Sequence, residues 1–152
     1  KKNVGSFSAL YPTPVTVIGA MNEEKSIWML VAHVGIIGRD WVLVLAKPYF
    51  ISGIIKEQEK LSINLVGEEM LMEVDVSGLV KEDKSVLFDC LMNEGGMSIV
   101  DKTPLTNGGT VIDVYEIEGF ESFICTIDNT YVEEHLNEFG KVNYNTLKSV
   151  LF

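Results

Sequence analysis

The chain has 152 residues, with 12 Lys and Arg against 22 Asp and Glu, and its formal net charge is −10. This length suits one compact domain, and 47% hydrophobic residues suffice for a buried core, which excludes an intrinsically disordered chain. The strong acidic excess and a single arginine, Arg39, exclude a nucleic-acid-binding surface, because phosphate backbones are bound by clustered Lys and Arg.

The sequence contains no signal for secretion or membrane insertion. The longest apolar run, residues 27–38, is interrupted by His33 and is shorter than the ~20 residues of a membrane-spanning helix. Cys90 and Cys125 lack the spacing of a disulfide framework or a CxxC motif, so we expect two buried, reduced thiols. We therefore expect a soluble, cytoplasmic protein without membrane contact. We also expect an incomplete C-terminal tail, because Phe152 ends the chain within an apolar stretch.

Strand patterns dominate the first half of the chain. Residues 15–21 are rich in β-branched side chains, and a polar turn separates them from a second predicted strand over 26–37. The second run is apolar on both faces, which predicts a strand covered by the core on one face and by a helix, a partner subunit or a planar ligand on the other. A strand over 41–46, a short helix over 50–60 and a strand over 61–66 follow.

The second half shows weaker periodicity. Residues 67–72 and 84–92 predict helical turns, and residues 93–110, which include Asn107-Gly108-Gly109, predict a loop. Two final strands, 110–117 and 120–128, flank Glu118-Gly119, a typical two-residue hairpin turn. The pattern predicts one domain over residues 1–152, of mainly β class: a Greek-key antiparallel β-barrel with short helices.

Catalytic motifs are absent from the chain. His33 and His135 are its only histidines, and neither has a partner at metal-ligand spacing, so we predict no metal site. The chain also lacks the GxSxG, GxGxxG and GxxxxGK[ST] patterns of hydrolases, dinucleotide-binding turns and P-loops. If the protein is an enzyme, a cofactor must supply its reactivity.

Four segments in a fixed order carry a family resemblance. They are residues 11–18 with Pro12-Thr13-Pro14-Val15, residues 25–33 ending in Ala32-His33, residues 49–57, and residues 61–66 with Ile63-Asn64. Together they resemble the flavin reductase-like, flavoredoxin-type proteins, and the match extends over residues 8–130. The resemblance implies an FMN-binding split β-barrel, a homodimer with FMN near the subunit interface, and electron transfer from NAD(P)H or a redox protein partner.

The resemblance also assigns cofactor contacts to particular residues. Flavin contacts would lie on the second strand, in the following loop, at the start of the helix and in the loop after the middle segment: Ser26, Ile27, Trp28, His33, Gly38, Arg39, Ser52 and Lys84. Ser52 and the cations Lys47 and Lys84 suit the phosphate of FMN. Flavin N5 would carry the chemistry, so no side chain is expected to be catalytic.

Three functions remain open at this stage. The first is an NAD(P)H-dependent flavin oxidoreductase, the second an FMN electron carrier without a pyridine-nucleotide site, and the third a flavin-free or non-catalytic dimeric split barrel.

Overall fold

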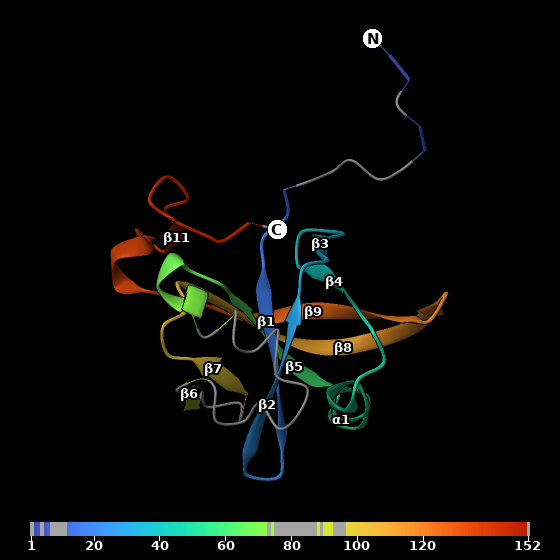
Figure 1. Ribbon diagram of the computed structural model, residues 1–152. Helices are drawn as coiled ribbons and strands as arrows, with labels where there is room; N and C mark the ends of the chain where they lie inside the picture. The colour runs from blue at the N-terminus through green and yellow to red at the C-terminus, as the bar shows by residue number, and fades with distance from the viewer. Residues whose placement is uncertain are drawn as a thin grey trace.

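The computed structural model describes residues 2–3, 5–6, 12–72, 74, 88, 90–92 and 97–151 (Figure 1). The longer elements are β1 (Thr16–Asn22), β2 (Lys25–Val31), β3 (Val34–Ile36), β4 (Trp41–Ala46), α1 (Phe50–Gln58), β5 (Lys60–Leu65), β8 (Leu105–Ile117) and β9 (Phe120–Val132). The shorter ones are the 3₁₀ turns η1 (Glu68–Met70) and η2 (Glu134–Leu136), and the strands β6 (Cys90–Met92), β7 (Ser98–Val100), β10 (Asn137–Glu138) and β11 (Lys141–Val142).

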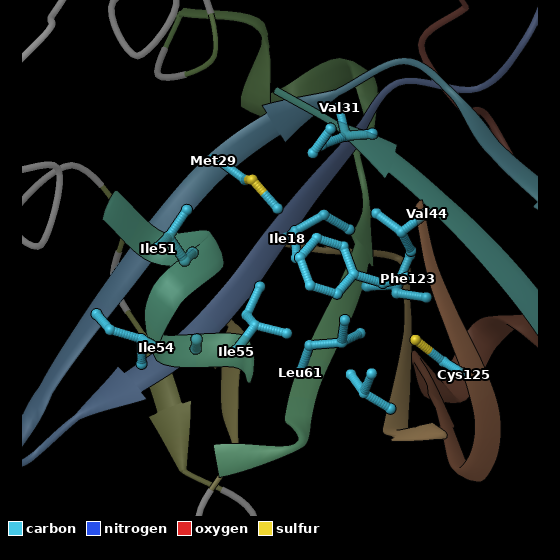
Figure 2. Packing of buried hydrophobic residues seen from close by; sticks show 14 of the residues in the cluster. Ile18, Met29, Val31, Val44, Ile51, Ile54, Ile55, Leu61, Phe123 and Cys125 are labelled. Carbon is cyan, nitrogen blue, oxygen red and sulfur yellow. The ribbon is translucent and has the colours of Figure 1, made fainter. Parts of the chain in front are cut away.

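Seven of the described strands form one antiparallel sheet in the order β2-β1-β5-β8-β9-β4-β3. The sheet curls around one core, so that Met29 of β2 and Val44 of β4 are buried in the same cluster (Figure 2). Ile51, Ile54 and Ile55 of α1 fill the remaining side of this cluster. The structure confirms the mainly β class, the antiparallel barrel and the short helices predicted from the sequence.

The predicted single strand over 26–37 is wrong. β2 ends at Val31, and β3 begins at Val34 on the opposite edge of the sheet, beside β4. The amide of Leu45 donates to the carbonyl of His33 at 3.0 Å, which holds the crossing segment against the end of β4. β2 contributes Met29 and Val31 to the core, whereas Ile36 of β3 is 85% exposed. An apolar run alone carries no signal for this break.

The outer face of β2 packs against the chain itself. Trp28 is 3% exposed, and its ring meets the edge of Phe88 with 5.8 Å between ring centroids. Val74 and Val100 belong to the same buried cluster, beside the β6–β7 hairpin. Both faces of this strand are therefore covered, and the described cover of the outer face comes from Val74, Phe88 and Val100 of the chain itself.

The predicted loop over 93–110 is wrong, since β7 and the first part of β8 lie within it. Gly109 sits at a bulge between β8 and β9, where an added Cβ would lie 2.8 Å from the carbonyl oxygen of Thr126. A close approach of two strands, and not a turn, therefore requires this glycine. Beside the bulge, Asp128 accepts hydrogen bonds from the Thr110 hydroxyl at 2.6 Å and from the Lys60 ammonium at 3.0 Å.

The remaining predictions are partly confirmed. The turn at Glu118-Gly119 joins β8 to β9 with φ of 47° and 82°, the positive values of a type I′ hairpin turn. η1 confirms the helical turn within 67–72. Most of residues 84–92 lie outside the described residues, but the last three form β6 and are not helical. Cys125 is buried as expected, whereas Cys90 is partly exposed.

Candidate cofactor site

The first turn of α1 leaves two main-chain amides without a hydrogen-bond acceptor among the described residues. Tyr49 precedes the helix in an extended conformation, and the amides of Phe50 and Ile51 donate to no atom of the described residues. No acidic residue lies in this turn. Because free amides and the helix dipole concentrate positive charge at a helix start, the turn favours an anion such as a phosphate.

Exposed side chains of suitable chemistry surround this turn. Lys47 directly precedes it and forms no ion pair within the described part of the chain. The hydrogen bond between Leu45 and His33 brings the exposed His33 to the same end of β4. Tyr49 and Phe50 are 56% and 74% exposed. A cation, two free amides and two aromatic rings therefore meet at one end of β4, a set that suits a phosphate ester carrying a flat ring.

Ser52 was predicted to contact a phosphate, but its hydroxyl is engaged within the turn. Ser52 is 1% exposed; its hydroxyl accepts a hydrogen bond from the Tyr49 amide at 3.3 Å and donates one to the Lys47 carbonyl at 3.3 Å. The side chain thus stabilises the link between β4 and α1. Free donors in this turn are the main-chain amides that follow Tyr49.

The three predicted contacts on β2 point to two different faces of the sheet. Ile27 packs against the barrel core, whereas Trp28 points to the outer face beneath Phe88. The Ser26 hydroxyl contacts the Ser98 hydroxyl at 2.6 Å and the thiol of Cys90 at 3.1 Å. These side chains all make contacts within the chain, and their role toward a cofactor stays a prediction.

The remaining predicted residues are dispersed. Gly38 and Arg39 lie in the exposed turn between β3 and β4, which is separated from α1 by the six residues of β4, about 17 Å of extended chain. Lys84 lies outside the described residues. The structure therefore brings His33 and Ser52 to the start of α1 and leaves Gly38 and Arg39 at the other end of β4.

Two features of this region escaped the sequence reasoning. The first is the pair of free main-chain amides of Phe50 and Ile51. The sequence indicates them only through an apolar helix start whose preceding residue, Tyr49, provides no capping side chain.

The second is Glu121, at the start of β9, which is 4% exposed and forms an ion pair with Lys56 of α1. Its position beside an exposed hairpin turn gave no indication of burial, because helix α1 covers it only in the folded chain.

A small hollow lies near the other end of α1. It measures about 90 Å³ and is lined by Gly19, Ala20, Met21, Gln58, Lys60, Leu61 and Met97. Pockets for small molecules usually measure about 300–1,000 Å³, so this hollow is too small for a nucleotide-sized cofactor.

Among the described residues, no three His, Cys, Asp or Glu side chains are placed to hold a metal ion. The described helices also include none with the length and apolar composition of a membrane span.

Comparison with solved structures identifies the architecture. A flavoredoxin from Methanosarcina acetivorans superposes with a TM-score of 0.88 at 25% sequence identity, covering 99% of this chain and 85% of that one. An FMN-binding protein from Thermus thermophilus gives 0.80 at 14% identity, covering 100% and 87%. An NADH:FAD oxidoreductase from Streptomyces globisporus C-1027 gives 0.76 at 11% identity, covering 93% and 82%. No protein-family model and no curated protein sequence matches the chain.

These similarities extend over nearly the whole chain and include a protein described as FMN-binding. TM-scores of 0.88 and 0.80 show that the chain shares its overall architecture with them. The chain has the flavin reductase-like, FMN-binding split-barrel fold.

Proposed function

We propose that this protein is an oxidoreductase that binds FMN and transfers electrons through it. The observation that carries the proposal is the similarity to flavoredoxin, which covers 99% of the chain at 25% identity. The scarcity of side-chain chemistry supports it, since the chain contains no nucleophile or metal-ligand motif. When bound, the flavin supplies the redox chemistry, and the protein binds it, orients it and excludes water.

The start of α1 fits the phosphate of such a cofactor. The amides of Phe50 and Ile51 would donate to phosphate oxygens, and Lys47 would contribute the positive charge. Absence of an acidic side chain from this turn matters in a chain with a net charge of −10, because a nearby carboxylate would repel the phosphate. The exposed rings of Tyr49 and Phe50 would shield the ligand from water.

For the electron donor we propose NADH or NADPH. The similarity in fold to an NADH:FAD oxidoreductase supports a pyridine nucleotide. A split barrel without flavin is the second candidate. It is favoured by one observation: the outer face of β2, where the family resemblance assigns flavin contacts, is filled by Trp28 and Phe88 of the chain itself.

Reconstitution and reduction test the proposal. The purified protein is incubated with excess FMN, desalted and examined by visible absorption before and after addition of NADH or NADPH. We expect a yellow protein with about one FMN per chain, bleached by one of the two nucleotides. Yellow protein that only dithionite or a reduced partner protein bleaches would identify an electron carrier, and protein that stays colourless would contradict both flavin functions.

We further propose that the protein forms a homodimer through the outer face of β4, β9 and β8. Alternating apolar side chains of these strands point away from the core and lie side by side: Trp41, Leu43, Leu45, Phe120, Ile124, Tyr115 and Ile117. Trp41, Tyr115 and Ile117 are each about half exposed, at 47%, 54% and 56%. Asp113, Ser122 and Thr126 are polar members of this face, and apolar faces of this extent commonly bind another protein.

A charge placed on this face tests the dimer. We expect the native protein to have twice the chain mass by light scattering, and Tyr115→Glu to have the mass of one chain. Phe139→Glu is the matched control, because Phe139 is fully exposed and lies at the β10–β11 turn, outside this face. A native protein of single-chain mass would contradict the proposal.

A further inference from the structure

We propose that Glu121 is a positioning residue: through Lys56 it holds helix α1 so that the free amides at the helix start point at the ligand phosphate. The proposal rests on the proposed FMN site. Glu121 itself cannot be a phosphate contact, because a carboxylate repels a phosphate, and burial of its side chain keeps it away from solvent.

The burial of Glu121 is unusual for a carboxylate. Its side chain is 5% exposed; one oxygen pairs with the Lys56 ammonium, and the other accepts a hydrogen bond from no atom of the described residues. A buried charge destabilises a protein strongly unless it is paired, so the native state depends on Lys56 staying in place. The pair therefore restrains the part of α1 that carries Lys56.

The location of the pair connects it to the ligand end of the helix. Glu121 lies opposite Ala46, the last residue of β4, in the β4–β9 register. Lys56 lies four residues after Ser52 and hence on the same side of α1. Ser52 in turn bonds the Lys47 carbonyl and the Tyr49 amide. One polar side of α1 is thus attached to the ends of β4 and β9 at two successive turns.

This attachment fixes the direction in which the first helical amides point. The apolar side of α1 is held on the barrel core by the packing of Ile51, Ile54 and Ile55, and the polar side is held by Ser52 and the Lys56–Glu121 pair. Rotation would turn the amides of Phe50 and Ile51 away from a phosphate without unfolding the helix. Ser52 and the Lys56–Glu121 pair are the groups that oppose it.

The test compares FMN with riboflavin, which has the same ring but no phosphate. Affinities of the whole protein for both are measured by quenching of flavin fluorescence. For Glu121→Gln and Lys56→Met we expect the preference for FMN over riboflavin to fall about tenfold, equivalent to about 1.4 kcal/mol. Lys56→Arg should retain it, because a guanidinium can also pair with the carboxylate.

The direction of the change separates positioning from other effects. If Glu121 acted on the phosphate only through its charge, Glu121→Gln would strengthen FMN binding, and an unchanged or increased preference for FMN would overturn the proposal. A general loss of stability would weaken both ligands equally, as we expect for the control Ser62→Ala, which removes a buried hydroxyl in β5. Failure of the native protein to bind either flavin would instead refute the proposed function.

Discussion

Replacement of Asn64 by alanine should remove a buried polar junction that connects four strands. Asn64 is completely buried, and its amide nitrogen donates to the Val17 carbonyl and to the Ser62 hydroxyl, each at 3.0 Å. Its amide oxygen accepts hydrogen bonds from the Val100 amide at 3.1 Å and from the Thr106 hydroxyl at 2.8 Å. Asn64→Ala leaves these last two donors buried without an acceptor. At about 1–3 kcal/mol for each, we expect a loss of about 2–6 kcal/mol in the free energy of unfolding.

The assay is urea unfolding followed by circular dichroism, with the slope of the transition used to confirm two-state behaviour. Asn107→Ala is the matched control. Asn107 is only partly buried, and its oxygen accepts one hydrogen bond, from the exposed Thr130 hydroxyl at 2.8 Å, so its loss should be below about 1 kcal/mol. Equal losses in the two variants, or a loss below about 1 kcal/mol for Asn64→Ala, would refute the reasoning.

Three further predictions concern the core and the titrating groups. Gly19→Ala places a Cβ 2.4 Å from a ring carbon of Trp28, and we expect a loss of about 1–3 kcal/mol in urea unfolding; an unchanged midpoint would show that the ring can move aside. Burial, with a smaller effect of the Asp128 charge, raises the pKa of Cys125 to about 12, so a thiol reagent at about pH 8 should modify Cys90 alone until the protein is denatured. Burial raises the pKa of Asp128, but hydrogen bonds to its carboxylate outweigh burial and keep it below the usual value. The ionised group therefore stabilises the fold above the unfolded pKa of about 3.9, and Asp128→Asn should be less stable than the native protein at neutral pH, with the difference disappearing as pH falls through the folded pKa.

Local patterns predicted the parts of the fold that depend on neighbouring residues. Residues 15–21 and 61–66 form strands, and α1 begins at Phe50, because periodicity and side-chain shape decide these elements locally. The split of 26–37 was not predictable in this way. Its two halves are similarly apolar, although Ile36 in the second half is 85% exposed, and the break at Ala32-His33 is decided by which edge of the sheet each half joins.

Glycines misled the interpretation of the second half. Asn107-Gly108-Gly109 predicted a turn, but the glycines accommodate a bulge where two strands approach closely. Only the position of the Thr126 carbonyl distinguishes the two cases, and that position depends on strand pairing across many residues.

In the candidate site, too, local features were predictable from the sequence and features that depend on packing were not. The family resemblance assigned Ser52 to the cofactor site, and a hydroxyl and a cation at a helix start made Ser52 and Lys47 suitable for a phosphate. Sequence reasoning could not foresee that the hydroxyl is used inside the turn, nor that Glu121 is buried beneath α1, since both depend on how the helix packs on the ends of β4 and β9.

The central claim about this protein is that the cofactor phosphate binds at the start of α1. Two-dimensional ¹H–¹⁵N NMR of the labelled protein during an FMN titration measures this directly, because each backbone amide reports on its own surroundings. We predict that the amide resonances of Phe50 and Ile51 show the largest downfield proton shifts with FMN, because these amides acquire a phosphate acceptor. With riboflavin, which lacks the phosphate, their shifts should be much smaller. Saturable FMN binding with the largest shifts elsewhere, and none at these two amides, would contradict this claim.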